Sequence, residues 1–140
     1  MENQLNLQDR VAIVTGAARG IGKKIAADFI AHGAHVVIGD LLDEVGNATA
    51  EELGSAASYV HCDISVLDEV HAMIDHAMSI TGRLDILVNN AAYNPSNPRE
   101  RTTVDKYPDE VFVKMMDVDI NGTYYCSKYA ALQMIEQQAG

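Results

Sequence analysis

The segment from residue 11 to residue 22 reads VAIVTGAARGIG, and it constrains the fold more than any other part of the chain. Its first five residues form a nearly continuous apolar run, which is typical of a strand buried on both faces of a parallel sheet. The glycine-rich residues 15–22 predict a tight turn, and apolar residues recur at helical spacing from Ile21 onward. A buried strand, a turn and a helix in this order predict a parallel sheet covered by helices.

Strand and helix patterns alternate along the rest of the first 90 residues. Three helices are expected to end near Gly33, Gly54 and Gly82, because glycine favours the left-handed conformation that follows a helix. Ser65 and Asp68 have the spacing of a capping box for the third helix. Further strands are expected at 35–40 (HVVIGD), 58–63 (SYVHCD) and 84–90 (LDILVNN).

The pattern changes after residue 91. Residues 92–108 contain the chain's three prolines and many polar residues, which predicts a surface loop with at most a short helical turn. A long helical pattern then runs from Asp109 to about Gln138, and the sequence stops at Gly140. A parallel sheet ordinarily needs another strand after such a helix. We therefore expect one α/β domain over residues 1–140, doubly wound and truncated after the long helix.

Composition narrows the possible functions. The formal net charge is −10, from 20 acids and 10 bases, which disfavours nucleic acid and anionic membranes as partners. Residues 1–40 hold four acids and four bases, so an anionic ligand meets least repulsion near that segment. Two cysteines far apart, Cys62 and Cys126, and a polar N-terminus without a signal-peptide pattern predict a reduced, cytoplasmic protein. His71 and His76 lie five apart, and we expect no metal site there.

The glycine-rich turn has the chemistry of a phosphate site. Glycines let the backbone approach a pyrophosphate closely, and a helix N-terminus offers free N–H groups and a positive dipole end. The next strand ends in an acid, Asp40, which lies 18 residues after Gly22. A carboxylate at that place accepts hydrogen bonds from ribose hydroxyls and repels a 2′-phosphate.

Together these motifs resemble the short-chain dehydrogenase/reductase family over the whole chain. The similarity rests on Thr-Gly-x-x-x-Gly-Ile-Gly at 15–22, Asp40 after the second strand, Asp63-Ile64 after the third, and Asn-Asn-Ala-Ala at 89–92 after the fourth. The family has a Rossmann-type fold that binds NAD or NADP, so the resemblance implies that fold and cofactor. Ala92 replaces a glycine usual in the family.

The resemblance also implies roles for individual residues. Asp40 would bind the adenosine ribose, and because Leu41 rather than an arginine follows it, NAD is expected over NADP. Asp63 and Ile64 would hold the adenine. Five residues would form the cofactor-binding turn: Gly16, Arg19, Gly20, Ile21 and Gly22. Asn90 and Ala91 would line the adenosine side of the site.

Some of these residues have a second interpretation that needs no cofactor. Asp63 could cap the turn before the next helix, Arg19 could be a solvated loop residue, and Asn89 is expected to form structural bonds between strands. An arginine at position 19 lies near the cofactor phosphates in the family. With Asp40 present it does not by itself indicate NADP.

The catalytic tetrad of the family, Asn, Ser, Tyr and Lys, is only partly represented. The family asparagine precedes a helical glycine by three residues, so Gly122 identifies Asp119, and not Asn121, as the corresponding position. Two residues correspond to about 200° of helical rotation, so Asn121 would face nearly the opposite way. Either Asp119 takes the asparagine role imperfectly, since it lacks the amide donor, or the helix is locally irregular.

Tyr124 and Lys128 mimic the family's Tyr-x-x-x-Lys motif, because residues four apart share a helix face. A nearby ammonium would lower a tyrosine pKa. In the family, however, the serine and this motif follow a fifth strand, which would lie beyond Gly140. We therefore interpret the pair as part of a packed helix, with the true motif absent.

The resemblance implies an oxidoreductase that transfers a hydride between NAD(H) and a small alcohol or carbonyl compound. This chain alone is expected to be inactive. The alternatives are a nucleotide-binding module without chemistry and one piece of a split enzyme. A homo-oligomer or an aggregation-prone monomer is expected, because seven residues of the long helix would be partly uncovered: Val111, Met115, Val118, Tyr125, Tyr129, Leu132 and Ile135.

Overall fold

A computed structural model describes residues 6–95, 97, 100 and 102–140. It contains a four-stranded sheet with the strand order β3-β2-β1-β4, in which all pairs are parallel. The strands are β1 (Val11–Thr15), β2 (His35–Asp40), β3 (Ala57–His61) and β4 (Ile86–Val88). The predicted doubly wound parallel sheet is confirmed, and the first two strands have the predicted bounds. β3 and β4 are shorter than predicted, because the polar residues at their ends turn into loops.

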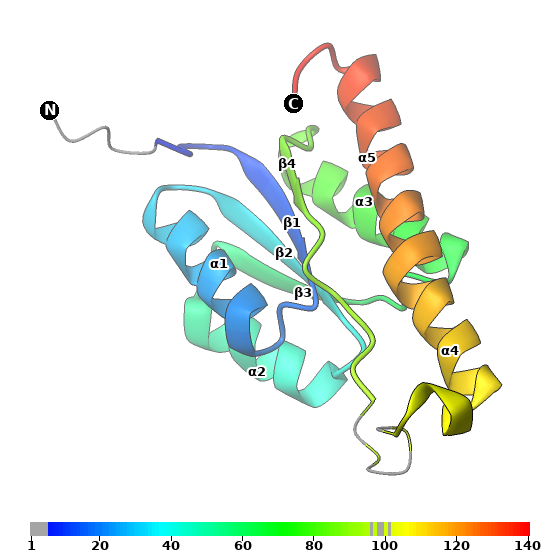
Figure 1. Ribbon diagram of the computed structural model, residues 1–140. Helices are drawn as coiled ribbons and strands as arrows, with labels where there is room; N and C mark the ends of the chain where they lie inside the picture. The colour runs from blue at the N-terminus through cyan, green and yellow to red at the C-terminus, as the bar shows by residue number, and fades with distance from the viewer. Residues whose placement is uncertain (1–5, 96, 98–99, 101) are drawn as a thin grey trace, which may run out of the picture.

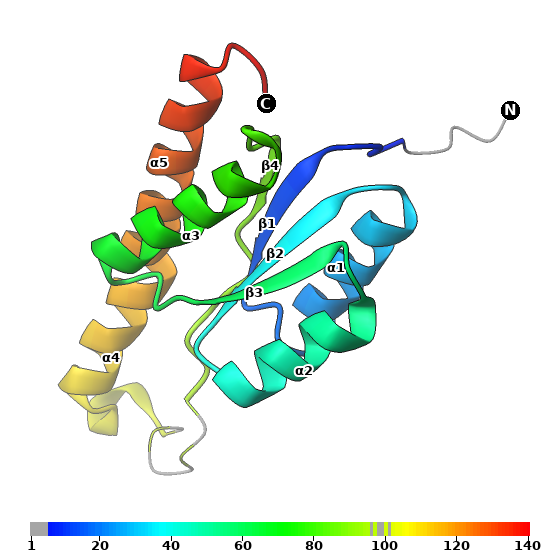
Figure 2. The ribbon, with the colours of Figure 1, turned by 180° about the vertical axis from the view of Figure 1, so that it is seen from behind.

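Helices cover both faces of this sheet (Figures 1 and 2). On one face lie α1 (Gly20–Ala31) and α2 (Asp43–Leu53), and on the other lie α3 (Leu67–Thr81) and α5 (Thr123–Glu136). β1 is in the middle and is fully buried, which explains its unbroken apolar run. Its residues alternate between the two cores: Ala12 and Val14 pack on the α1 side, and Val11 and Ile13 pack with the residues of α3.

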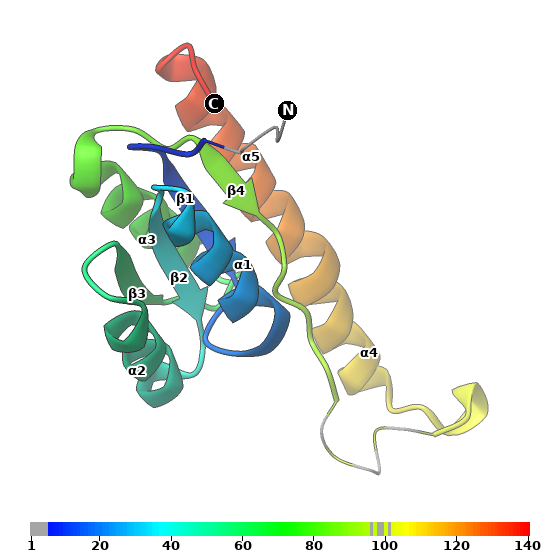
Figure 3. The ribbon, with the colours of Figure 1, turned by 90° about the vertical axis from the view of Figure 1, so that its left-hand side faces the viewer.

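The predicted long helix after the loop is present as three consecutive segments. They are α4 (Asp109–Met116), the π-helical turn η3 (Asp117–Gly122) and α5. Figure 3 shows them as one nearly continuous helix running alongside β4. A short 3₁₀ helix, η2 (Val104–Lys106), precedes them. Within the described parts of the chain, no helix is both long enough and apolar enough to cross a membrane.

The predicted capping box at the start of α3 is wrong. The N-cap residue is Val66, and it makes no side-chain hydrogen bond to the helix. The Ser65 hydroxyl instead donates to Asp63 Oδ1 at 2.6 Å. The hydroxyl turns away from the helix because Asp63, in the loop after β3, offers it a charged acceptor nearby.

The apolar surface of the long helix differs in part from the prediction. Val111 is buried, contrary to the prediction. The other six residues are partly or largely uncovered as predicted: Met115, Val118, Tyr125 and Tyr129 are half-buried, and Leu132 and Ile135 are exposed. The π-helical turn holds more residues per turn than an α-helix, so it shifts the phase of the apolar stripe between α4 and α5. The large apolar side chains that are exposed along this segment are Phe112, Val113, Met116, Ile120, Tyr124, Leu132 and Ile135. We call this set the exposed helix face.

Candidate functional site

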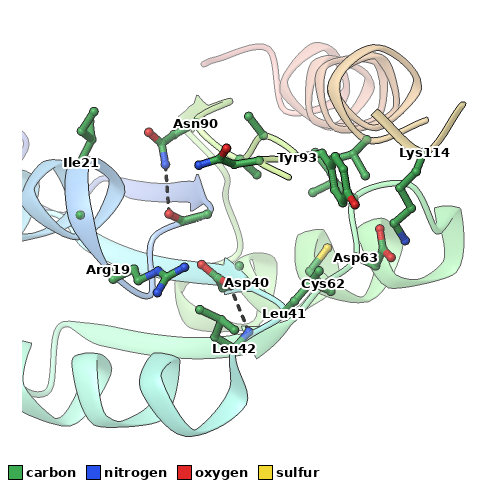
Figure 4. A pocket seen from close by; sticks show the side chains of 18 residues that line it. Arg19, Ile21, Asp40, Leu41, Leu42, Cys62, Asp63, Asn90, Tyr93 and Lys114 are labelled. Carbon is green, nitrogen blue, oxygen red and sulfur yellow. Dashed lines mark hydrogen bonds between the residues drawn. The ribbon is translucent and has the colours of Figure 1, made fainter. Parts of the chain in front are cut away.

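A cavity of about 430 Å³ lies outside the carboxyl ends of the strands (Figure 4). The loops that follow all four strands contribute to it, together with Lys114 and Val118 of the long helix. The chain passes from β1 to β2 on one side and later to β4 on the other, so the crevice lies where the strand order changes direction. Open parallel sheets bind ligands at such a point.

The glycine-rich turn is packed too closely for other residues. A Cβ atom at Gly16 would lie 2.7 Å from the Ala91 Cα atom, and φ at Gly16 is +66°. A Cβ atom at Gly22 would lie 2.5 Å from the Gly16 carbonyl oxygen and 2.6 Å from the side-chain nitrogen of Asn90. These close approaches bring the backbone of the turn against the segment after β4 and leave its outer side open to the cavity.

Helix α1 begins at Gly20 on the wall of the cavity. Its N-cap residue, Arg19, makes no side-chain cap hydrogen bond, and the first turn of the helix holds no acidic residue, so the helix itself supplies no negative charge at the positive end of its dipole. Gly20 lines the cavity, and a Cβ atom there would meet no atom within 4 Å. Ile21, the first residue of the apolar pattern of α1 and one of the residues expected in the cofactor turn, is 76% exposed and lines the cavity.

Asp40 joins the glycine-rich turn to the loop after β2. Its Oδ2 atom accepts a hydrogen bond from the Ala18 N–H at 3.0 Å, and its Oδ1 atom accepts one from the Leu42 N–H at 3.1 Å. A carboxylate has about four acceptor positions, so both oxygens keep capacity for a ligand. In Figure 4, Arg19 and Asp40 lie at one end of the cavity, and Tyr93, Asp63 and Lys114 lie at the other.

Asp63 caps a turn, which is the second interpretation that the sequence left open for it, and it also lies at the cavity. Its Oδ1 atom accepts hydrogen bonds from the Ser65 N–H at 3.0 Å and from the Ser65 hydroxyl, so it does cap this turn. It also lines the cavity, as does the neighbouring Ile64, which is buried. Gly122 allows the long helix to approach Ile64, because a Cβ atom at residue 122 would lie 2.6 Å from the Ile64 side chain.

Asn90 and Ala91 fix the end of β4 to the glycine-rich turn. The Asn90 side-chain amide donates to the carbonyl oxygens of Thr15 and Gly16, both at 3.0 Å. The N–H groups of Asn90 and Ala91 donate to the Thr15 hydroxyl. Asn89 does not bond to a neighbouring strand as predicted. Its amide donates to the Ser127 hydroxyl of α5 at 2.9 Å, because β4 ends at Val88 and residue 89 already faces the helix.

The side chains of Asp119 and Asn121 have different neighbours, as the sequence predicted from their positions around the helix. Asp119 Oδ1 accepts a hydrogen bond from the Tyr93 N–H at 2.7 Å, so the carboxylate holds the loop after β4. The Asn121 amide donates to Asp117 on the exposed side of the helix. Both residues belong to the π-helical turn η3, so the helix is also irregular here. Asp119 itself does not line the cavity, whereas Tyr93 does.

Tyr124 and Lys128 lie outside this cavity, on α5. The Lys128 Nζ atom is 5.7 Å from the ring centroid of Tyr124 and 5.5 Å from that of Tyr129. These distances fit a cation–π contact with two rings rather than a proton-transfer pair. The prediction that the pair belongs to the packed side of a helix is wrong for Tyr124, because its side chain is 56% exposed.

Several lining residues were not identified from the sequence. Leu41 and Leu42 follow Asp40 directly, Cys62 precedes Asp63, and Tyr93 follows the Asn-Asn-Ala-Ala segment, so adjacency to the motifs was an available signal. Lys114 and Val118 carry no such signal, because only the packing of the long helix brings them to the cavity. Cys62 is buried in the cavity wall, and burial raises the pKa of its thiol to about 12.

Comparison with known proteins gives consistent results. The chain is 37% identical to secoisolariciresinol dehydrogenase from Forsythia intermedia over 135 residues, covering 96% of this chain and 48% of the relative. It is 41% identical to sex determination protein tasselseed-2 from Zea mays, covering 96% of this chain and 40% of the relative. The chain therefore spans about half the length of the curated relatives it matches.

A solved structure is also similar: 3-ketoacyl-(acyl-carrier-protein) reductase from Brucella melitensis, complexed with NADH. The TM-score is 0.86 at 33% identity, and the match covers 94% of this chain and 52% of that one. The similarity supports the Rossmann-type fold seen in the sheet order. The family model described as short chain dehydrogenase matches residues 10–140. The chain thus belongs to the short-chain dehydrogenase family.

Proposed function

We propose that this chain is the cofactor-binding half of an NAD-dependent oxidoreductase that interconverts an alcohol and a carbonyl group of a small molecule. One observation carries the proposal. The cavity is lined at once by a helix N-terminus without a side-chain cap, by the carboxylate of Asp40 and by the Asp63–Ile64 pair, and the similar Brucella melitensis reductase is complexed with NADH. Each of these features suits a different part of a dinucleotide.

The fit of the pyrophosphate to the glycine-rich turn is supported by the packing. Glycine at positions 16 and 22 lets the backbone close tightly, and the N–H groups at the start of α1 are not capped by a side chain. Such a helix end binds anions through its N–H groups and its dipole. Arg19 is exposed at this rim and adds a positive charge near the same place.

The preference for NAD over NADP follows from Asp40. Its carboxylate is held by two backbone N–H groups, so it cannot rotate away easily, and both of its oxygens retain room for ribose hydroxyls. A 2′-phosphate at this position would meet a like charge. Leu41 and Leu42 line the adjacent wall and offer no positive charge to compensate.

A bound nicotinamide supplies the hydride donor or acceptor. The residues of this chain bind and orient the dinucleotide, and the apolar side chains of Ile21, Ile64 and Val118 limit water in the cavity. We propose that Asp119 contributes as a positioning residue, because it fixes the backbone of Tyr93 at the cavity wall. The family's serine and Tyr-x-x-x-Lys are proposed to lie in the half of the relatives that this chain does not match.

A second candidate is one piece of a split enzyme, completed by a C-terminal partner. The exposed helix face favours it, because seven large apolar side chains of one long helix are exposed there, and exposed apolar surface invites association. The same surface supports self-association as a homo-oligomer. Mixing the chain with a separate C-terminal half and measuring turnover distinguishes the split enzyme from a module without chemistry. The two cysteines are free and buried, which suits the proposed cytoplasmic location.

Fluorescence titration with NADH and NADPH tests the cofactor proposal. NADH is expected to bind more tightly by about tenfold, which corresponds to about 1.4 kcal/mol of repulsion. Asp40→Ala should narrow this ratio, because it removes both the ribose acceptor and the charge. Asp28→Ala is the matched control, since Asp28 is an exposed acid on α1 that does not line the cavity. Equal or tighter binding of NADPH to the unaltered chain would refute the preference.

A further inference from the structure

A cluster of partly exposed, interacting side chains lies next to the loops after β2 and β3, and its residues come from β3, α2 and α3. His61, the last residue of β3, places its Nδ1 atom 2.6 Å from Asp43 Oδ1 and its Nε2 atom 3.7 Å from Glu69 Oε2. The Tyr59 hydroxyl lies 2.6 Å from the same Asp43 oxygen. One imidazole is therefore flanked by two carboxylates from different helices.

Both carboxylates are close to loops that line the cavity. Asp43 begins α2 directly after residues 40–42, and the Tyr59 hydroxyl also lies 2.8 Å from the Asp40 carbonyl oxygen. Glu69 Oε2 accepts a hydrogen bond from the Asp63 N–H at 2.6 Å. The imidazole thus connects the loop that carries Asp40 with the loop that carries Asp63.

The protonation state of His61 decides how strong this connection is. The contact with Asp43 requires a proton on Nδ1, because a carboxylate can only accept. In the neutral ring, Nε2 then presents a lone pair to the Glu69 carboxylate, whereas in the charged ring it presents an N–H and forms an ion pair. The hydrogen bond to Asp43, and the charges of Asp43, Glu69 and Asp63, raise the pKa of His61 against a smaller opposing effect of burial.

We propose that His61 is a positioning residue for the adenosine end of the cofactor site: its protonated ring bridges Asp43 and Glu69, holds the loops of Asp40 and Asp63 together, and so strengthens dinucleotide binding. This inference rests on the proposed function. Protonation also offsets part of the negative charge that Asp43, Glu69 and Asp63 place near the adenosine end of the cavity, where it would disfavour an anionic dinucleotide. The positive charge of the imidazolium therefore acts in the same direction as the bridge.

The expected consequence is a pH-dependent affinity. NADH should bind more tightly below the pKa of His61 and more weakly above it, by about two- to fivefold, the range for one partly exposed ion pair. Linkage requires the reverse effect as well, so bound NADH should raise the pKa of His61. A residue that only supports the fold would not produce this reciprocity.

The test is a titration with NADH from about pH 5.5 to about pH 9, on either side of the ordinary histidine value. His61→Gln keeps a side-chain N–H donor but cannot be protonated, so its affinity should lose the pH-dependent step. His32→Gln is the matched control, because His32 follows α1 at the opposite edge of the sheet and is exposed. NMR of the histidine rings, with and without NADH, measures the pKa of His61 directly.

The outcomes separate this inference from the proposed function. The role of His61 is supported if NADH affinity falls with rising pH in the unaltered chain and in His32→Gln but not in His61→Gln, and if the pKa of His61 is higher in the complex with NADH. NADH binding with the same pH profile in His61→Gln overturns the role of His61 and leaves the cofactor site intact. No NADH binding by the folded chain at any pH overturns both proposals.

Discussion

Replacement of the buried Asp85 should destabilise this chain more than replacement of any exposed acid. The Asp85 side chain is 3% exposed and lies between the amino ends of β1 and β4. Its Oδ2 atom accepts a hydrogen bond from the Val11 N–H at 2.9 Å, and its oxygens also accept from Arg83 Nε at 2.8 and 2.9 Å and from Arg10 at 2.9 Å. In return, the Asp85 N–H donates to the Val11 carbonyl.

The magnitude of the Asp85→Ala effect follows from which partners can reach water. The side chains of Arg10 and Arg83 are 48% and 36% exposed, so they become hydrated again and their lost ion pairs cost less than about 1 kcal/mol each. Val11 is completely buried, and its unsatisfied N–H costs about 1–3 kcal/mol. We therefore expect a loss of about 2–4 kcal/mol in the free energy of unfolding.

Urea denaturation followed by circular dichroism at neutral pH measures this loss. The matched control is Asp28→Ala, which removes an exposed (i, i+4) ion pair with Lys24 and should cost about 0.3–0.5 kcal/mol. If Asp85→Ala lost no more stability than the control, the argument that the Val11 N–H depends on this carboxylate would be refuted.

The pH dependence of the same site has a defined sign. Burial alone would raise the pKa of Asp85, but the hydrogen bonds from Arg83, Val11 and Arg10 outweigh it and hold the pKa below its usual value. The contribution of Asp85 is therefore fully present above the unfolded-state pKa of about 3.9 and is lost as the pH falls through the folded-state value. The difference in stability between the unaltered chain and Asp85→Asn should shrink in that acidic range.

Three further predictions concern other parts of the molecule. Ile120→Glu on the exposed helix face should shift the chain from oligomer to monomer in analytical ultracentrifugation. If the unaltered chain is already a monomer and binds no dye specific for apolar surface, the proposed association is contradicted. Burial raises the pKa of Cys62 to about 12 and that of Cys126 to about 11. Both thiols should therefore react slowly with a thiol reagent at mildly alkaline pH until the chain unfolds, and fast labelling of the folded chain would contradict this. In a longer form of the protein that carries the C-terminal half, a folded Tyr124→Phe variant should lose little turnover, and a loss of orders of magnitude at normal NAD affinity would make Tyr124 catalytic. In the same protein, Asp119→Asn should keep the hydrogen bond from the Tyr93 N–H and at least preserve turnover.

Local sequence patterns were sufficient to predict the elements that depend on local chemistry. The nearly continuous apolar run at 11–15 predicted a strand buried on both faces, and β1 has that environment. The tight turn after β1 was predictable from its glycines, because only glycine allows both a positive φ and a close approach of two backbone segments. Gly16 meets both conditions. Asp40 followed from its place at the end of β2, since the carboxyl ends of parallel strands meet at one edge of the sheet.

Other features were determined only in the folded structure, some by contacts between segments far apart in the sequence and some by local competition or irregularity. Lys114 and Val118 reach the cavity because the long helix packs beside β4, which no local pattern encodes. The hydroxyl of Ser65 turned to Asp63 instead of capping α3, because a charged acceptor nearby competes with the helix N–H groups. The phase of the exposed helix face depended on the π-helical turn, which shifts every following residue around the axis. His61 acquired two carboxylate neighbours only when β3, α2 and α3 came together, because side-chain proximity across elements is fixed by packing rather than by sequence spacing.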